Sequence, residues 1–273
     1  MPLFVSPSVK KIPVIIPHYR HADRLELCKQ HLFAQEGVEI ELFVRDNNVD
    51  NILYTAAINE GLRKFCYTPD HDYVLVLNQD AYLDPATLRT LVAFMEENPA
   101  CGIASPLHVS SDRQTVTWGG ATRAFPFGGH RSDPLANYTS PFKTHWANGA
   151  CMLIRCETVR EAGLFDKNMR FICSDADFSF TARLRGWHVH VVPGPLCVHA
   201  LDTSTAGDND ELTLIKLRDA LYFGQKWLDG GLYRQVAWEG QMLTELEVQR
   251  EIAARKQEIL YLQMKIATAG ATK

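Results

Sequence analysis

The first half of the chain alternates short apolar runs with helical patterns, and this alternation constrains the fold more than any other feature. Strands are predicted at residues 12–17, 39–45 and 73–77, and helices near 23–35, 52–65 and 84–97, the last with Pro85 at its first helical position. The run Tyr73–Leu77 is apolar throughout, as expected of a strand buried on both faces. The alternation predicts an α/β fold with a mostly parallel, Rossmann-like sheet flanked by helices.

The second half is less regular. Residues 107–146 are rich in Gly, Pro, Ser and Asp, so a short strand near 115–118 and then a mobile loop are predicted, with residues 123–144 as a candidate lid. Strands at 150–155 and 187–192 and helices at 157–162, 175–185 and 210–227 are predicted beyond it.

The last forty residues form a separate amphipathic helix, which predicts one domain over 1–228 and a C-terminal helical extension over 229–273. Its apolar positions follow alternating three- and four-residue steps, broken by Arg255: Val248, Ile252, Ile259, Leu262 and Ile266. Three interpretations stay open. The helix packs on its own domain, forms a homo-oligomer through a short coiled coil, or makes a peripheral contact with a membrane surface.

Charge and cysteine content exclude several classes of protein. A net charge of −4 gives no electrostatic reason to expect a nucleic-acid partner. The seven cysteines are odd in number and contain no C-x-x-C pair, which favours reduced thiols in a cytoplasmic protein. The N-terminus lacks the pattern of a signal peptide, and no apolar stretch approaches the ~20 residues needed to span a bilayer. The expected location is therefore the cytoplasm, including the inner face of the membrane.

Three predicted strands end in polar residues: Pro17-His18-Tyr19, Asp46-Asn47-Asn48 and Asn78-Gln79-Asp80. Ligands bind at the carboxyl edge of the strands in open α/β sheets. A single polar strand end is more often an ordinary turn. Because three occur on consecutive strands, they predict a binding site at this edge.

The order of these and later motifs resembles glycosyltransferase family 2, which has the GT-A fold. The matching segments are V-I-I-P-H-Y-R, F-V-R-D-N-N, Asn59-Glu60-Gly61, L-V-L-N-Q-D-A-Y-L-D-P, G-A-C-M-L-I-R-C-E-T-V-R-E-A-G-L-F-D, S-D-A-D-F-S-F-T-A-R-L-R-G-W-H-V-H-V-V-P and L-C-V-H-A. Each motif is weak alone, and their order and spacing over residues 11–228 carry the resemblance. The chain departs from the family in two places: Asn78 replaces the first carboxylate of D-x-D, and Ser174 replaces the usual glutamate.

The resemblance implies a donor site for a nucleotide-diphosphate sugar. Asp80 would hold a divalent cation that neutralises the departing diphosphate, with His199 as a second ligand and Asn78 beside it. Oxygen ligands favour Mg²⁺ or Mn²⁺, and a histidine favours Mn²⁺. Taken alone, His199 is better explained as an ordinary strand-end histidine.

The nucleoside would lie against Pro17, His18 and Tyr19, with Asp46 accepting the imide N–H of uracil or thymine. The other interpretation of Asp46 is a turn carboxylate that satisfies nearby backbone amides.

For catalysis, the resemblance implies that Asp175 is the base of an inverting transfer, with Asp177 helping to hold the site. Ser174 and Asp177 also have the spacing of a helix capping box, which is compatible with that role. Trp146, Asn148 and Gly149 resemble the acceptor-side segment, where Trp146 either stacks on a sugar or belongs to the core.

The predicted activity is thus transfer of a sugar from a UDP- or dTDP-linked donor to a saccharide or lipid-linked acceptor in surface polysaccharide synthesis. The resemblance points to hexosyl- or rhamnosyltransferase-like enzymes. One alternative is a non-catalytic sugar-binding or assembly subunit, favoured by Asn78 and Ser174. A nucleotidyltransferase is disfavoured, because P-H-Y-R-H-A-D-R contains no glycine-rich phosphate loop.

Overall fold

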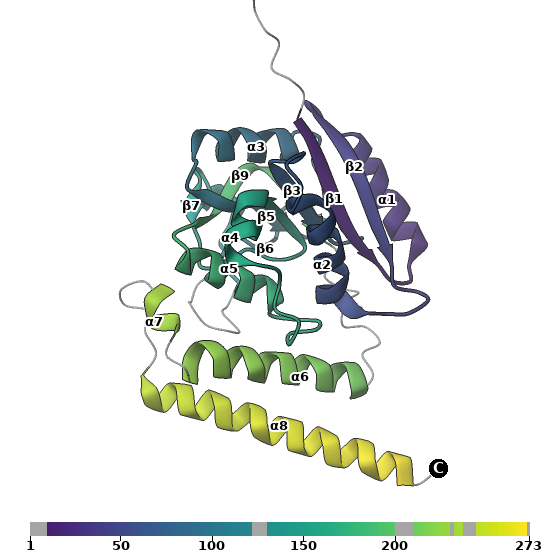
Figure 1. The fold of residues 1–273 in the computed structure, drawn as a ribbon, viewed down its shortest axis with the longest axis vertical. Coiled ribbons are helices and arrows are strands. Elements are labelled where there is room, and N and C mark those ends of the chain that lie inside the picture. The colour runs from purple at the N-terminus through teal and green to yellow at the C-terminus, as the bar shows by residue number, and fades with distance from the viewer. Residues whose placement is uncertain (1–9, 122–129, 200–209, 230–231, 237–243, 272–273) are drawn as a thin grey trace, which may run out of the picture.

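A central sheet with helices on both faces organises the computed structural model, which describes residues 10–121, 130–199, 210–229, 232–236 and 244–271 (Figure 1). The strand order is β2-β1-β3-β8-β5-β9-β4, with β6 paired to β5 and β7 to β9. The strands are β1 (Lys10–His18), β2 (Val38–Asp46), β3 (Tyr73–Leu77), β4 (Ala81–Leu83), β5 (Cys101–Val109), β6 (Val116–Trp118), β7 (Phe142–Lys143), β8 (Cys151–Arg155) and β9 (His188–His199).

The sheet is mostly parallel, as predicted. β1 pairs in parallel with β2 and β3, and β5 pairs in parallel with β9. β8 lies antiparallel between β3 and β5, and β4 is antiparallel to β9 at one edge. The carboxyl ends of β1, β2 and β3 therefore lie side by side.

Helices cover the two faces of the sheet. They are α1 (Ala22–Phe33), α2 (Leu53–Cys66), α3 (Thr87–Glu97), α4 (Cys156–Ala162) and α5 (Ser174–Leu184). A further layer, away from the sheet (Figure 1), contains α6 (Asp210–Gly224), α7 (Tyr233–Val236) and α8 (Glu245–Ala271), with a π-helical turn at Gln225–Asp229. A 3₁₀ turn lies at Leu135–Asn137. One buried core joins the sheet to α1 and α3, and a second joins it to α2, α4 and α5.

Burial on both faces of the sheet explains why the strand Tyr73–Leu77 is apolar throughout. Val74 and Val76 belong to the core beside α2, whereas Tyr73, Leu75 and Leu77 belong to the core beside α1 and α3. Successive side chains of a strand point to opposite faces, so a strand covered by helices on both sides needs apolar residues at every position.

The segment 107–146 holds more regular structure than was predicted. It begins inside β5, which was not predicted because Gly102, Ser105 and Pro106 interrupt its apolar run, although every residue of β5 is buried. β6 confirms the strand predicted near 115–118, and β7 adds a short strand inside the predicted loop. The Gly119 N–H donates to the Arg131 carbonyl, and the Arg131 N–H donates to the Gly120 carbonyl. The lid at 123–144 stays a prediction, and its residues 123–129 lie outside the described part.

Two element boundaries differ from the predictions. α3 begins at Thr87, so Pro85 precedes the helix instead of opening it. β9 continues past Val192 to His199, because the ladder skips from Ser105↔Val191 to Leu107↔Leu196 and leaves Pro193-Gly194-Pro195 in a bulge. This extension carries His199 to the carboxyl edge of the sheet.

The C-terminal helix α8 packs along α6 on the side of the sheet that carries α5 (Figure 1). Ile252 and Ile259 are 5% and 9% exposed, and Ile252 joins the core that contains Phe223 and Trp227. Packing on its own domain is confirmed for these two positions, and the side chains of Val248, Leu262 and Ile266 lie outside the described part. The domain boundary at 228 and self-association stay predictions.

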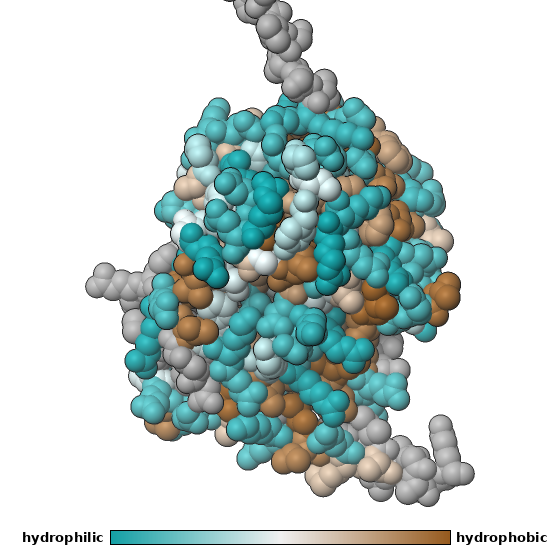
Figure 2. Space-filling view, viewed as in Figure 1, coloured by the Kyte–Doolittle hydropathy of each residue, from teal (hydrophilic) through white to brown (hydrophobic). Residues whose placement is uncertain are grey.

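The outer side of α8 is mixed in character. Leu260, Tyr261 and Met264 are exposed, and brown apolar atoms alternate with teal polar atoms along the α6–α8 layer at the bottom of Figure 2. Within the described residues, no helix has the length and apolar content of a bilayer span.

Truncating Ile252 to alanine is expected to destabilise the protein by about 2–5 kcal/mol, because it opens a cavity between α8 and the core. The control is Leu260→Ala on the same helix, where the side chain is 60% exposed and the cost should stay within about 0.5 kcal/mol. Urea unfolding curves measure both. Equal costs would show that α8 does not dock through Ile252.

Candidate active site

The first three strand ends meet in one network of hydrogen bonds. The Gln79 side chain joins the β3 turn to the β1 turn: its Nε2 donates to the Tyr19 carbonyl (2.9 Å), and its Oε1 accepts the Tyr19 N–H (3.1 Å). The same oxygen lies 2.7 Å from His18 Nδ1. The sequence motifs indicate no role for Gln79, although its position between Asn78 and Asp80 could have suggested one. Its hydrogen bonds to the β1 turn fix Asn78 and Asp80 relative to β1.

Asp46 has the contacts of a turn carboxylate. It lies opposite His18 in the β1–β2 ladder, and its Oδ1 accepts the Asn48 N–H (2.9 Å) and the Asn48 Nδ2–H (2.7 Å). These hydrogen bonds hold the pKa of Asp46 below its ordinary value. The carboxylate is exposed at the edge of the sheet and charged at neutral pH.

Asp80 and His199 lie together, as the sequence predicted. Ala81 of β4 pairs with His199 of β9, and this pairing sets the His199 ring beside the Asp80 carboxylate, with 3.5 Å between Nε2 and Oδ1. The side chains are only 9% and 12% exposed. The antiparallel contact of β4 with the extended end of β9 therefore joins residues more than a hundred positions apart.

The chemistry of this pair fits a divalent cation. A carboxylate oxygen and an imidazole nitrogen are the donors that Mn²⁺ accepts, and the carboxylate alone suits Mg²⁺. Within the described residues there is no group of three or more His, Cys, Asp or Glu side chains able to hold a metal. Asp80 and His199 therefore offer one oxygen and one nitrogen ligand to a cation.

Asp175 lies in the first turn of α5 and binds the segment before β8. Its Oδ2 accepts the Gly149 N–H (2.8 Å), and its Oδ1 accepts the Ala176 N–H (2.8 Å). Burial raises the pKa of Asp175, while these two hydrogen bonds and the neighbouring His130 act in the opposite direction. A carboxylate in this environment is a stronger proton acceptor than an exposed aspartate.

The predicted capping box is not formed. α5 begins at Ser174 after Cys173, which has a left-handed backbone (φ 67°), and no side chain caps the helix. The buried Ser174 hydroxyl instead accepts a hydrogen bond from Thr55 (2.8 Å). Asp177 faces the C-terminal layer, where its Oδ1 binds Trp227 Nε1 and Lys226 Nζ, each at 2.7 Å. Asp177 thus anchors α5 to that layer and does not contact the Gly149 segment.

The Asn78–Asp80 turn and Asp175 are linked through two adjacent residues, Gly149 and Ala150. The Asn78 N–H donates to the Ala150 carbonyl (3.0 Å), and the preceding residue, Gly149, donates to Asp175. The Asn148 side chain closes this turn by accepting the Ala150 N–H (2.9 Å). The structure therefore brings the Asn78–Asp80 turn and Asp175 to the same segment, from β3 and α5.

Trp146 belongs to the core. It is 7% exposed, and its ring lies 6.2 Å from Trp118 and 5.6 Å from His130 between centroids. A tryptophan buried against other rings does not offer an open face to a sugar, so the core interpretation holds for Trp146 in this structure.

Replacing Gly149 by alanine is expected to destabilise the protein by about 1–3 kcal/mol. An added Cβ would lie 2.3 Å from the Tyr54 hydroxyl and 3.2 Å from Asp175 Oδ2, so the segment would shift. Denaturant unfolding measures the cost. The double variant Gly149→Ala/Tyr54→Phe removes the obstructing hydroxyl and should recover part of it, whereas strictly additive costs would contradict this explanation.

The arrangement of this sheet and its helices matches the GT-A fold of solved glycosyltransferases. Residues 73–267 match the sequence profile described as "Glycosyl transferase family group 2", which is well over half of the chain. The chain belongs to this family. The matched range contains Asp80, Asp175 and His199, and it excludes β1 and β2 with Pro17, His18, Tyr19 and Asp46.

Solved structures share the fold at low identity. The mannosyltransferase PcManGT from Pyrobaculum calidifontis, in complex with GDP-Man and Mn²⁺, is 14% identical with a TM-score of 0.57, over 97% of this chain and 81% of that one. S. aureus TarS is 14% identical with a TM-score of 0.53, over 92% of this chain and 43% of TarS. GalNAc-T7 with UDP, GalNAc and Mn²⁺ is 12% identical with a TM-score of 0.54, over 83% and 54%.

A search of curated protein sequences gives no match to this chain. The structural neighbours thus show the fold, and the profile match shows that the family is one of glycosyltransferases.

Proposed function

We propose that the protein is an inverting glycosyltransferase that moves a sugar from a UDP- or dTDP-linked donor to a saccharide or lipid-linked acceptor by single displacement. One observation carries the proposal. Asp80, paired with His199, and Asp175 are held at one place through Asn78, Ala150 and Gly149. A leaving diphosphate and an attacking hydroxyl need a cation site and a base in such proximity.

On the donor side, Asp80 and His199 would hold Mn²⁺ or Mg²⁺, which supplies positive charge to the leaving diphosphate. Pro17, His18 and Tyr19 would line the nucleoside, and Asn78 would lie beside the diphosphate. Asp46 is exposed and charged, and its carboxylate would accept the imide N–H of uracil or thymine. Complexes of neighbouring GT-A proteins with UDP and with Mn²⁺ support this assignment.

For catalysis, we assign Asp175 as the base that removes the proton of the acceptor hydroxyl. Burial raises its pKa, which makes the carboxylate a stronger proton acceptor than an exposed aspartate, and the Gly149 N–H orients it. Asn148 and Gly149 would position the acceptor through their backbone, with Trp146 supporting them from the core. Asp177 acts at a distance by fixing α5 to Lys226 and Trp227.

The acceptor and setting follow from the family resemblance. We assign the protein to surface polysaccharide synthesis at the inner face of the cytoplasmic membrane, with a rhamnosyltransferase-like or other hexosyl specificity. Residues 1–228 would form the catalytic domain and 229–273 the helical extension, through which two copies would associate or the protein would contact the membrane.

The competing function is a non-catalytic sugar-binding or assembly subunit. Ser174 favours it, because the position where the family has a glutamate holds a buried hydroxyl bonded to Thr55. Asn78 in place of an aspartate also favours it. Against it, the chain keeps Asp80 beside His199 and a buried carboxylate, Asp175, in the first turn of α5.

Thermal shift with a panel of nucleoside diphosphates and nucleotide sugars in the presence of Mn²⁺ tests the donor assignment. A ligand at 100 times its Kd stabilises a protein by about 2.7 kcal/mol, which raises Tm by about 5–10 °C for a chain of this size. Uridine or thymidine ligands should give this rise, and adenosine ligands should give less. If every uridine and thymidine ligand leaves Tm unchanged, the donor assignment is wrong.

A further inference from the structure

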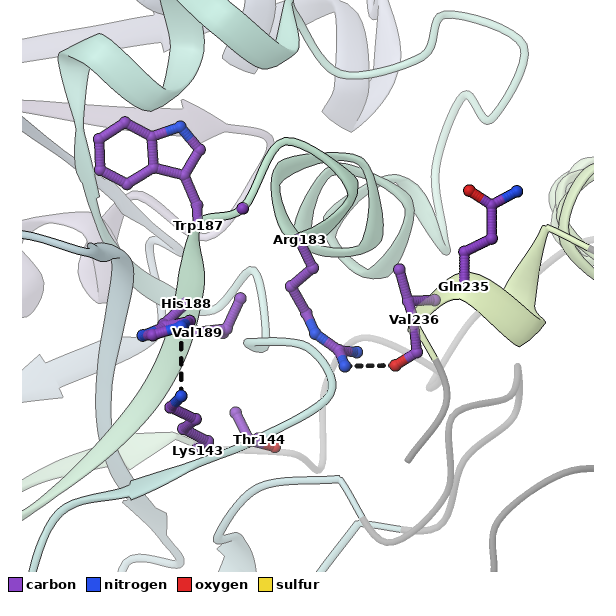
Figure 3. A pocket seen from close by; sticks show the side chains of 9 residues that line it. Lys143, Thr144, Arg183, Trp187, His188, Val189, Gln235 and Val236 are labelled. Carbon is purple, nitrogen blue, oxygen red and sulfur yellow. Dashed lines mark hydrogen bonds between the residues drawn. The ribbon is translucent and has the colours of Figure 1, made fainter. Parts of the chain in front are cut away.

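A second pocket lies at the far end of α5 from Asp175. The cavity has a volume of about 250 Å³ and is formed by β7, the last turn of α5, the start of β9 and α7 (Figure 3). Its lining residues are Lys143, Thr144, Arg183, Gly186, Trp187, His188, Val189, Gln235 and Val236. α5 has 11 residues, and a helix of that length spans about 16 Å, which separates this pocket from Asp175.

Two cationic side chains line the pocket. Lys143 reaches in from β7, and its Nζ lies 3.1 Å from His188 Nε2. Arg183 enters from α5 on the other side of the cavity (Figure 3). Burial, together with the positive charges of Lys143 and Arg183, lowers the pKa of His188. None of the nine described lining residues is acidic, and Lys143 and Arg183 each carry a positive charge.

Arg183 is held in place before any ligand arrives. Its Nη1 contacts His145 Nδ1 (3.2 Å) and the His145 carbonyl (3.3 Å), and its Nη2 donates to the Val236 carbonyl. Burial lowers the pKa of Arg183 to about 10, so it stays charged at neutral pH. A fixed guanidinium loses little freedom when it binds an anion, which favours binding.

We infer that this pocket binds a phosphate group, at a site separate from the donor site. Lys143 would contact the phosphate as a mobile point charge, and Arg183 would provide a fixed guanidinium. The cavity is smaller than the range of about 300–1,000 Å³ typical of drug-sized ligands, so it suits inorganic phosphate, a small phosphomonoester or a lipid headgroup. The inference does not depend on the assignment of the sugar donor.

Isothermal titration of the full chain with inorganic phosphate, at low ionic strength with EDTA, tests the inference. Phosphate should bind, and Lys143→Gln should weaken binding by about fivefold or more, because it removes one charge-assisted contact. Lys29→Gln removes an equal charge from α1 and should leave binding unchanged. Asp80→Asn should also leave it unchanged, since the donor site is not involved. Absence of binding, or equal affinity in the wild type and Lys143→Gln, would overturn the inference.

Vesicle sedimentation separates the two sources of phosphate. Sedimentation with phosphatidic acid vesicles, lost in Lys143→Gln and absent with phosphatidylcholine, identifies a lipid headgroup. Binding of inorganic phosphate without sedimentation identifies a soluble phosphate. Sedimentation that is the same for the wild type and Lys143→Gln would place the membrane contact elsewhere. A lipid headgroup would then be excluded as the ligand of this pocket.

Discussion

Asp175→Asn is expected to lower the rate of sugar transfer by about 10²–10⁴-fold, the range that positioned general bases contribute. The amide cannot take the proton of the acceptor hydroxyl, yet it has nearly the same shape as the carboxylate. Donor affinity should stay within about threefold of the wild type, because Asp80 and His199 are untouched. Transfer assays under saturating donor, with calorimetry of donor binding, separate the two effects.

Stability needs a control in this experiment, because the Asp175 carboxylate accepts backbone N–H groups of Gly149 and Ala176. An amide nitrogen facing one of them costs about 1–3 kcal/mol, so unfolding curves should accompany the rates. Asp72→Asn is the matched control: it lies at the opposite edge of the sheet, where Asp72 pairs with Lys10, and should transfer normally. Near-normal turnover by Asp175→Asn would place the base elsewhere.

Asp80→Asn is expected to abolish the dependence of donor binding on Mn²⁺ and to lower turnover by at least about 100-fold. A metal ion contributes several kcal/mol to charge stabilisation in the transition state, and each 1.36 kcal/mol is a factor of ten in rate. His199→Gln should have a similar but smaller effect, because the negatively charged ligand, Asp80, remains. Titration of Mn²⁺ in the presence of UDP measures the loss for each variant.

The control for the cation site is Asp46→Asn, another carboxylate at the same edge. It should change the preference among nucleobases and leave the Mn²⁺ dependence intact, since Asp46 binds Asn48 and lies on β2. If Asp80→Asn retains the Mn²⁺ dependence of the wild type, Asp80 does not hold the cation and the donor side has been assigned wrongly.

The sequence predicted the parallel part of the fold well, because its signals are local. Tyr73–Leu77 is a buried strand at the predicted residues, because a short unbroken apolar run is typical of a strand covered on both faces. β5 was missed, because its burial comes from partners distant in sequence, β8 and β9, while Gly102 and Pro106 look like breakers. The extension of β9 to His199 was missed for the same reason: its bulge makes sense only beside β5.

At the site, the family motifs identified candidate residues, but only the structure shows how these residues are arranged. The proximity of Asp80 and His199 follows from the pairing of β4 with β9, which no local pattern contains. The capping interpretation of Ser174 and Asp177 was wrong, because tertiary partners, Thr55 for one and Lys226 and Trp227 for the other, take up both side chains. Gln79 had no motif role, yet it joins two turns of the site.

The proposed function depends on a cation that activates a nucleotide sugar. Release of the nucleoside diphosphate by the wild type, from a panel of nucleotide sugars with Mn²⁺ and with EDTA, tests this directly. At least one UDP- or dTDP-linked sugar should be turned over with Mn²⁺, EDTA should stop the reaction, and added Mn²⁺ should restore it. If no nucleotide sugar gives metal-dependent turnover, the proposed transfer activity is wrong and the non-catalytic alternative is favoured.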